Sequence, residues 1–580
     1  MSIRPLAAAA LLFLPLAAPA KAPTTGQPGM TSAADPRAAA AGAEILRAGG
    51  SATDAAIAMM LALNVVEPHN SGIGGGGFLL HSDGATGKLD TYNGREKAPA
   101  AADIRWFYGA DGKPLSIRDA IPGGRSVGVP GNLAMMALAH KAHGRLPWAR
   151  LFQPAIRLAT DGFAITPRMF GMMSNYSSHV DAWGKSYLLG ADGKPKPVGT
   201  ILKNPDQAAF FARIAKKGPA EFYRGKTAAK LVATVNDSPR NPSKMTVRDL
   251  SAYTAQQFAP VCGTYRAYKV CGMGPPSSGG VAVLQILKQL ERFDMAALGK
   301  DSPTAWHLFA ESSRLAYADR NAYLGDPDKV SVPVAGLTDP AYLAARSALI
   351  APDRSMATIA AGAPPGAPPK QPVPPRDEQG TSHMVAVDRQ GDVVTITSTI
   401  ESIFGSGLTL NGIFLNNELT DFDIVPEADG YLVANRVEGG KRPRSSMAPT
   451  IVYGPDGRIR IALGAAGGST IIAQIAKALV GVLDWNLSAQ DAIALPLLYA
   501  PGATGVVEKG TALEAMVPAL NALGEKLAVA PLGLKANAVE WKDGHWQGAA
   551  DPRSEGEAYN EDGTKASNIT RVGKPPQVRD

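Results

Sequence analysis

The chain has 580 residues, of which 45% are hydrophobic and 19% are charged. This composition is typical of a globular protein with a large core, and it excludes a chain that is disordered throughout. The net charge of +7 comes from scattered lysines and arginines without a block of five or six. The sequence therefore gives no support for a nucleic-acid-binding tract.

The first 20 residues have the pattern of an export signal. Arg4 supplies a positive charge, residues 6–16 form an apolar stretch, and residues 18–20 (APA) form a small-residue cleavage site. This stretch is too short to span a membrane, and no later apolar run is long enough to do so. We therefore expect a signal peptide over residues 1–20, no membrane anchor, and a periplasmic or secreted mature protein.

The next elements alternate between helical and strand-like patterns. An alanine-rich helix is predicted from Asp35-Pro36 to Gly49-Gly50, and a second helix begins at a capping box at residues 51–54. The segments FLLHSDG and KLDTYNG predict strands, residues 101–260 mix helices with loops, and VAVLQILKQL predicts another helix. This alternation favours an α/β or α+β fold.

The only two cysteines, Cys262 and Cys271, lie at the ends of a strand-like segment. In an oxidising compartment they could close a hairpin with one disulfide, and two independent thiols are the alternative. Their spacing matches no zinc or redox motif, and the eight histidines show no ligand spacing. The sequence therefore predicts no metal site.

A change of composition divides the chain near residue 380. Residues 361–379 contain seven prolines, which predicts an extended linker rather than a helix or strand. Strand patterns follow from Gly380-Thr381 to about residue 475, with a helix over 471–483. The polar stretch from about Ser554 is expected to form surface loops or a loosely held tail.

Two glycine motifs match known signatures without the context that these require. Residues 72–77 satisfy G-x-G-x-x-G, but a helix precedes and a strand follows, the reverse of a dinucleotide site. Ser126 stands in a G-x-S-x-G sequence, but a loop-like segment precedes it and Pro130 follows. We therefore expect a glycine turn and no serine nucleophile, and keep a Ser126 hydrolase as a minor alternative.

Residues 381–399 predict a β-hairpin with its turn at Gln390. If Asp388 pairs with Asp392, Thr399 lies opposite Thr381, with their Cβ atoms about 5 Å apart. Facing threonines are usually ordinary strand residues. Here, however, Gly380 and a proline-rich linker precede Thr381. We predict that the Thr381 hydroxyl attacks the Gly380 carbonyl, and that the freed α-amino group then activates this hydroxyl.

The chain also resembles a known family, the γ-glutamyltransferases. The matching motifs are GTSH at 380–383, NNELTDF at 416–422, KRPRSSM at 441–447, GGS at 467–469, SGIGGGGF at 71–78, GREKAP at 94–99, PPSSGG at 275–280 and YADRNAYLGDP at 317–327. The resemblance implies a four-layer αββα N-terminal nucleophile fold, made as one precursor. It implies a cut between Gly380 and Thr381 into a large subunit (21–380, with the linker 361–380 at its end) and a small catalytic subunit (381–580).

The resemblance also implies roles in binding a γ-glutamyl donor. Arg95 would hold the α-carboxylate of the donor, with help from the hydroxyls of Ser445 and Ser446. The α-ammonium of the donor would be held by three acidic residues, Glu401, Glu418 and Asp421. Many family members have amides at the positions of Glu401 and Glu418.

The remaining implied roles concern the reaction itself. Gly467 and Gly468 would donate backbone N–H groups to the oxyanion of the tetrahedral intermediate, and Thr399 would orient the Thr381 hydroxyl. The resemblance implies no metal and no organic cofactor. The loop after Asp421 matches neither the lidded nor the lidless form of the family, so the balance between hydrolysis and transpeptidation stays open.

Besides the minor Ser126 alternative, these observations favour one function and leave two others open. The leading hypothesis is transfer of a γ-glutamyl group, from glutathione or a similar compound, through an ester on Thr381 to water or to an amino-acid or peptide amine. One alternative is a related glutaryl or cephalosporin acylase with the same threonine, which has no need of an ammonium pocket. The other is an uncleaved binding protein without chemistry.

Overall fold

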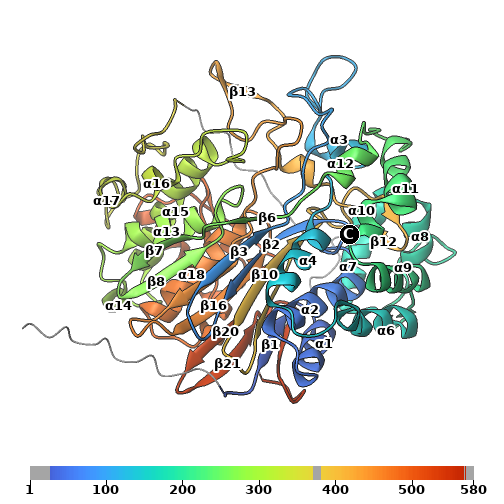
Figure 1. Cartoon of the computed structure of the whole chain (residues 1–580). Coiled ribbons are helices and arrows are strands. Elements are labelled where there is room, and N and C mark those ends of the chain that lie inside the picture. Colours follow the sequence, from blue (N-terminus) through green and yellow to red (C-terminus); the bar gives the residue numbers. More distant parts are fainter. Residues whose placement is uncertain (1–25, 370–379, 567–568, 570–580) are drawn as a thin grey trace, which may run out of the picture.

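Two antiparallel β-sheets pack face to face in the computed structural model, which describes residues 26–369, 380–566 and 569 (Figure 1). The first sheet has seven strands in the order β22 (Glu557–Asn560), β1 (Met30–Ala33), β9 (Ser382–Val387), β10 (Val393–Thr399), β2 (Gly76–Ser82), β3 (Leu89–Asn93) and β6 (Gln256–Phe258). The second has six strands in the order β21 (His545–Ala550), β20 (Lys535–Lys542), β16 (Ile459–Ala466), β15 (Thr450–Tyr453), β8 (Tyr268–Gly272) and β7 (Val261–Tyr265).

Helices cover the outer face of each sheet. On the first sheet, α1 (Pro36–Arg47) begins after the Asp35 cap, and α2 (Ala52–Val66) begins at the predicted capping box of Ser51 and Asp54. On the second sheet lie α13 (Gly279–Leu290) and α18 (Thr470–Leu483), with α15 (Pro303–Tyr323) packed against α13. The four layers that the resemblance implies are present.

Further helices and short strands surround these layers. Between β3 and β6 the chain forms α3 (Ile117–Ala120), α4 (Asn132–His143), α5 (Trp148–Leu151), α6 (Gln153–Asp161), α7 (Pro167–Tyr176), α8 (Ala182–Leu188), α9 (Pro205–Lys217), α10 (Ala220–Tyr223), α11 (Gly225–Asn236) and α12 (Val247–Ser251). Near α13 lie α14 (Met295–Leu298), α16 (Val334–Leu337) and α17 (Pro340–Ser347), and the C-terminal part adds α19 (Ala489–Ala494) and α20 (Ala512–Ala522). Small sheets are formed by β4 and β5 (163–164, 201–202), β11 and β12 (409–410, 413–414), β13 and β14 (427–428, 431–432), and β17 to β19 (498–499, 505–508, 527–530).

The hairpin register predicted around Thr381 is confirmed. Ser382 pairs with Ser398 and Val387 with Val393, and the N–H of Asp388 donates to the Asp392 carbonyl at 3.1 Å. This register places the start of β9 beside the end of β10. Both strands are buried on both faces, since β9 and β10 lie between α2 and the second sheet.

The expectation of a loose tail after Ser554 is wrong for the described residues. Residues 557–560 form β22, which pairs with β1 at the edge of the seven-stranded sheet. Ala558 is fully buried, and the carboxylate of Glu561 accepts hydrogen bonds from the Gly29 N–H and the Arg389 side chain. This pairing joins chain ends that lie far apart in sequence, which a local polar composition does not indicate.

The two rejected glycine motifs have the structures expected of them. Residues 72–75 form a turn between α2 and β2, without a helix after the glycines. Ser126 ends a 3₁₀ turn (Gly124–Ser126), and its hydroxyl donates to the carbonyls of Ile121 and Gly123 at 2.6 and 2.9 Å. This buried serine therefore does not lie on a strand-to-helix elbow.

Three further predictions concern membrane-spanning helices, the signal peptide and the linker. None of the described helices combines the length and the apolar composition needed to cross a bilayer. The predicted signal peptide and linker residues 370–379 lie outside the described residues.

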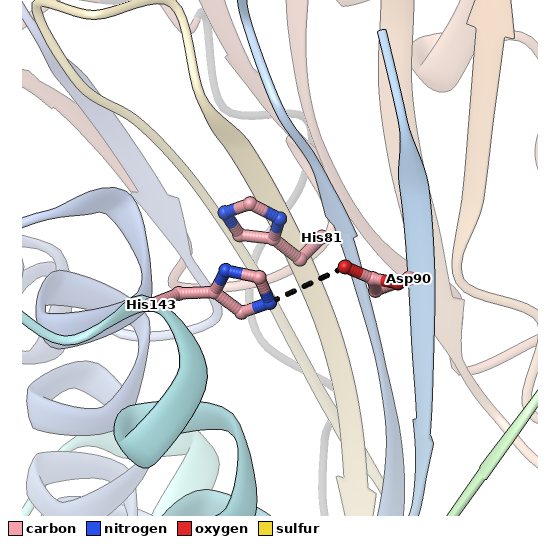
Figure 2. Close-up of side chains that lie close together, drawn as sticks. All are labelled: His81, Asp90 and His143. Carbon is pink, nitrogen blue, oxygen red and sulfur yellow. Dashed lines mark ion pairs between the residues drawn. The ribbon is translucent and has the colours of Figure 1, made fainter. Parts of the chain in front are cut away.

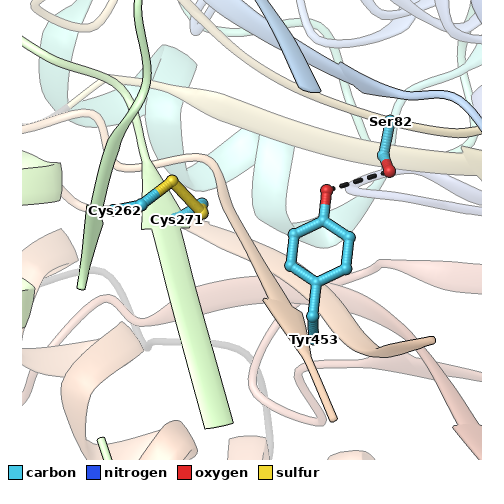
Figure 3. Close-up of a disulfide and its surroundings, with 4 residues drawn as sticks. All are labelled: Ser82, Cys262, Cys271 and Tyr453. Carbon is cyan, nitrogen blue, oxygen red and sulfur yellow. Dashed lines mark hydrogen bonds between the residues drawn. A yellow bond between two sulfur atoms is a disulfide. The ribbon is translucent and has the colours of Figure 1, made fainter. Parts of the chain in front are cut away.

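Covalent and polar links join neighbouring strands and the two sheets. Cys262 of β7 and Cys271 of β8 are direct cross-strand partners and form the predicted disulfide (Figure 3). Beside them, the Tyr453 hydroxyl on β15 donates to the hydroxyl of Ser82 on β2 at 2.9 Å (Figure 3). The second contact crosses the apolar layer between the two sheets, so it fixes one sheet relative to the other.

Removing the disulfide tests its contribution to stability. In a Cys262→Ser/Cys271→Ser variant we expect the free energy of unfolding to fall by about 2–3 kcal/mol. Without the disulfide, no closed loop restricts the unfolded chain, so its conformational entropy rises and unfolding becomes easier. The measurement is thermal unfolding with and without reductant. Reductant should lower the midpoint of the wild type and leave that of the variant unchanged, and equal midpoints without reductant would contradict the prediction.

Candidate active site

Two threonine hydroxyls meet at the carbonyl of Gly380. Thr381 directly precedes β9 and Thr399 ends β10, and both hydroxyls donate to the Gly380 oxygen, Thr399 at 2.6 Å. The Thr399 oxygen in turn accepts from the N–H of Glu401 at 2.7 Å. The hydroxyls thus converge on the carbonyl between them. Two donors on one carbonyl polarise it toward attack by a nearby nucleophile.

Gly380 is required sterically at this position. Its N–H donates to the Glu401 carbonyl at 2.6 Å, and a Cβ atom at residue 380 would lie only 2.2 Å from that same oxygen. Glu401 itself has a φ of 73°, which a side-chain-bearing residue rarely adopts. Close approach of two backbone segments therefore holds the Gly380 carbonyl against the hydroxyls.

A buried ion pair lies directly beneath the start of β9. The Ser382 hydroxyl donates to the Glu67 carboxylate at 2.7 Å, and Lys535 pairs with that carboxylate at 3.0 Å. Burial by itself raises the pKa of Glu67, but the charge of Lys535, with smaller contributions from His69 and Ser382, outweighs it and lowers this pKa to about 2. Glu67 is therefore ionised at neutral pH and ties α2, β9 and β20 together.

Thr381 lines a cavity of about 440 Å³ together with Gly467. Gly467 and Gly468 connect β16 to α18 and have φ values of 119° and 57°. Backbone N–H groups at a helix N-terminus lack intrahelical partners, so this turn can present donors to an anion beside Thr381. The cavity also contains the cationic side chains of Arg168 and Lys535.

A larger cavity of about 1050 Å³ adjoins the first, because both are lined by Tyr176 and Ile403. Its walls carry charges of both signs: Asp119, Glu401, Asp421 and Asp423 are acidic, and Arg118, Arg240, Arg320 and Arg444 are basic. Such a lining can bind a zwitterionic group. Its position beside the Thr381 cavity lets one substrate extend from the charged groups to the threonine.

Arg95 lies behind this cavity in a fully buried charge cluster. It follows β3 and donates to the carboxylates of Glu418 and Asp421, and to the backbone carbonyls of Pro443 and Arg444 at 3.1 and 2.8 Å. Burial disfavours its charge, but the carboxylates outweigh this effect and raise the pKa of Arg95. The guanidinium thereby connects residues 418–421 to residues 443–444.

Three carboxylates surround this one guanidinium, so not all of them are ionised together. Burial is the main cause that raises the pKa of Glu418, and it raises the pKa of Glu96 to about 8. Glu96 and Glu418 therefore keep at least one proton between them at neutral pH. Asp421 belongs both to this cluster and to the wall of the larger cavity.

The two serines of the 441–447 motif have different partners. Ser446 accepts a hydrogen bond from Arg320 at 2.6 Å, and Arg320 also donates to the Ser278 hydroxyl at 2.8 Å. The Ser445 hydroxyl accepts from the N–H of Met447 at 3.2 Å, and its carbonyl accepts from Ser278. Three separate sequence motifs thus meet at Arg320.

The structure therefore divides the predicted site residues into two groups. Thr381, Gly467, Glu401 and Asp421 line the two cavities. Absent from both linings are Thr399, Gly468, Arg95, Glu418, Ser445 and Ser446. Arg320 was not predicted as a site residue, although it stands within the motif at 317–327. Arg168, Tyr176 and Lys535, which line the Thr381 cavity, stand in no motif of the sequence.

Comparison with known proteins identifies the family of this chain. Residues 38–560 match the family described as Gamma-glutamyltranspeptidase. The chain belongs to this family. Its relatives named glutathione hydrolase proenzyme include one from Bacillus subtilis (strain 168), 35% identical over 92% of this chain and 91% of that protein. Another, from Escherichia coli (strain K12), is 36% identical over 92% of this chain and 91% of that protein.

Acylases of the same fold are also similar. An Acylase ACY 1 proenzyme from Pseudomonas sp. (strain V22) is 36% identical over 92% of this chain and 94% of that protein. Cephalosporin acylase from Bacillus halodurans superimposes with a TM-score of 0.81 at 26% identity, over 94% of this chain and 99% of that chain. Helicobacter pylori gamma-glutamyltranspeptidase superimposes with a TM-score of 0.53 at 34% identity, over 56% of this chain and 91% of that chain. The chain is thus an enzyme with the fold shared by these transpeptidases and acylases.

The Glu67–Lys535 pair predicts a pH-dependent stability. Since the folded pKa of Glu67, about 2, lies below its ordinary value of 4.5, its contribution is complete above about pH 4.5. It is lost as the pH falls toward 2, and its size is on the order of 3 kcal/mol. Glu67→Gln should therefore lower the unfolding midpoint most at pH 7, with the difference from wild type shrinking toward pH 3.

Thermal unfolding between pH 3 and 7 measures this difference. The control is Glu427→Gln, which alters an exposed carboxylate on β13 and should leave the midpoint unchanged. A difference between wild type and Glu67→Gln that is constant with pH would show that the ion pair does not supply it.

Proposed function

We propose that this protein cuts itself between Gly380 and Thr381 and then transfers γ-glutamyl groups from glutathione-like donors through an ester on Thr381. The convergence of the Thr381 and Thr399 hydroxyls on the Gly380 carbonyl carries the proposal. The family and the proenzyme names of the relatives also support it. In this proposal residues 21–380 and 381–580 become the large and small subunits, and residues 1–20 direct export to the periplasm or medium.

Self-cleavage would begin with attack of the Thr381 hydroxyl on the Gly380 carbonyl. The C–O bond forms, the peptide C–N bond breaks, and the proton passes to the leaving nitrogen, which becomes the α-amino group of Thr381. Water then hydrolyses the ester, which frees the Gly380 carboxylate and the Thr381 hydroxyl. Thr399 assists by its hydrogen bond to the carbonyl oxygen, where negative charge develops.

The freed amino group would then serve as the base for acyl transfer. It takes the proton of the Thr381 hydroxyl as this attacks the γ-carbonyl of the donor, and returns it to the leaving amine. The Gly467–Gly468 turn, at the N-terminus of α18, would supply N–H donors to the oxyanion. Water or an amino-acid or peptide amine would then accept the γ-glutamyl group from the ester.

The charged cavity would bind the amino-acid end of the donor. Glu401 and Asp421 would hold the α-ammonium, and Arg95, Ser445 and Ser446 the α-carboxylate. For Arg95 this requires the substrate carboxylate to replace Asp421, one of its present partners. Glu418 would then keep the guanidinium oriented from behind.

The first experiment tests the cut. Intact mass spectrometry of the wild type should show a fragment that begins at Thr381, whereas Thr381→Ala should stay whole because it has no hydroxyl to attack. Thr399→Val should be cut about 10²-fold more slowly or worse, since one donor to the developing oxyanion is lost. Thr409→Val, a strand threonine away from the hairpin, is the control. An uncut wild type with full activity would exclude the mechanism.

A second experiment distinguishes γ-glutamyl transfer from the acylase reaction. Asp421→Asn should raise KM for a γ-glutamyl anilide by about tenfold or more, because a charged hydrogen-bond partner of the ammonium is lost. KM for the desamino glutaryl anilide should change much less. Asp119→Asn, at the rim of the same cavity, is the control. A ratio of the two KM values unchanged by Asp421→Asn would favour the acylase alternative.

A further inference from the structure

Two histidines and an aspartate meet at the surface of the first sheet, away from Thr381. His81 and Asp90 are direct cross-strand partners on β2 and β3, and His143 is the last residue of α4. The two imidazole rings stack with centroids 3.6 Å apart, and the His143 Nε2 atom lies 3.6 Å from an Asp90 oxygen. Figure 2 shows that one ring nitrogen of each histidine faces Asp90.

We propose that His81, Asp90 and His143 bind a divalent metal ion, with Zn²⁺ as the preferred occupant. One potential ligand atom from each residue lies within 4.8 Å of the other two. Bonds of about 2.1 Å in a tetrahedral zinc site place neighbouring ligand atoms about 3.4 Å apart. The His143–Asp90 distance already has nearly this value. The His81 ring must rotate out of its stack on His143, because an imidazole nitrogen binds a metal in the plane of its ring and the two rings are now nearly parallel.

An unsatisfied nitrogen provides an independent argument for a ligand. His81 is 2% exposed, and its buried Nδ1 atom has no hydrogen-bond partner among the described residues. Buried polar atoms in proteins nearly always have a partner, and a nitrogen without one among the described residues calls for an ion or a water molecule. A metal at the centre of the cluster would satisfy this nitrogen.

The surroundings of the cluster suit a cation. The Tyr92 hydroxyl lies 2.6 Å from His143 Nε2, beside Asp90. When the metal takes this nitrogen, the hydroxyl is released to donate to the carboxylate, as supporting residues around zinc ligands do. Asp83 and Asp392 add negative charge near His81. Lys88 opposes it by pairing with Asp90 at 3.0 Å, but its side chain is 71% exposed and can turn into solvent.

A second cluster of similar composition differs in that its side chains already have partners within the protein. His307, Glu311 and Glu525 also lie close together, but Arg314 pairs with both carboxylates. The His307 nitrogens are bonded to Glu525 and to the Ala351 carbonyl. Internal partners thus already satisfy this cluster, in contrast to His81.

The position of the proposed site implies a structural role. His81 lies five positions along β2 from Gly76, which pairs with Thr399, so about 17 Å of strand separates the metal from the nucleophile. The ion would join the end of α4 to β2 and β3. It would stabilise the fold without entering the reaction.

Isothermal titration of Zn²⁺ into the full-length, chelator-treated and desalted protein tests the proposal. The wild type should bind one equivalent, and the thermal midpoint should rise with added Zn²⁺. His143→Ala and Asp90→Asn should weaken binding by at least about tenfold, and Tyr92→Phe, the mildest change, by about tenfold. The matched control is His140→Ala, on the same helix and with a side chain exposed to 19% against 18% for His143.

The outcomes separate the site from other sources of binding. Retained affinity in His140→Ala with loss in the three cluster variants supports the site. Absence of stoichiometric binding to the wild type, or equal affinity in wild type and His143→Ala, overturns it. Chelation should leave γ-glutamyl transfer unchanged at 25 °C, and loss of activity with a folded protein would overturn the structural role. The titration itself does not depend on the proposed reaction.

Discussion

The antiparallel pairing of β9 with β10 determines where every group around Thr381 lies. One register runs from the turn at residues 388–392 to the end of β10, and it brings the Gly380 carbonyl beside the Thr399 hydroxyl. The hairpin cannot slip by one residue, because each slip would exchange the faces that pack on α2 and on the second sheet. Burial on both faces therefore gives the precision that a nucleophile needs.

Buried charges surround this hairpin, and each is balanced by a specific partner. Glu67 is ionised because Lys535 compensates for burial. Around Arg95, burial raises the pKa of both Glu96 and Glu418, so one guanidinium does not keep all of its neighbouring carboxyls ionised. A buried charge without a partner is strongly destabilising. The same rule explains how an incoming zwitterion can be recognised here, since it offers one partner for each sign of charge in the cavity wall.

Local patterns in the sequence predicted local structure well. The hairpin register, the capping box of α2 and the Cys262–Cys271 pair each depend on residues close together in the chain, so turn chemistry and alternation were sufficient. Local patterns could not predict pairing between residues far apart in the chain. The residues of β22 were expected to form a tail, and the cluster of His81, Asp90 and His143 was not predicted because its members lie up to 62 positions apart. The motifs gave Arg95 and Asp421 as site residues, but not that they pair with each other.

The strand order has a consequence for assembly. In the first sheet β1 lies between β22 and β9, so a strand that precedes residue 380 is hydrogen-bonded on both sides to strands that follow it. In the second sheet β15, which follows residue 380, pairs with β8, which precedes it. A chain cut at Gly380 would therefore be two interleaved polypeptides sharing one core. Synthesis as a single chain acts as the template for this arrangement, fixes a one-to-one stoichiometry, and leaves neither piece able to diffuse away without unfolding the other.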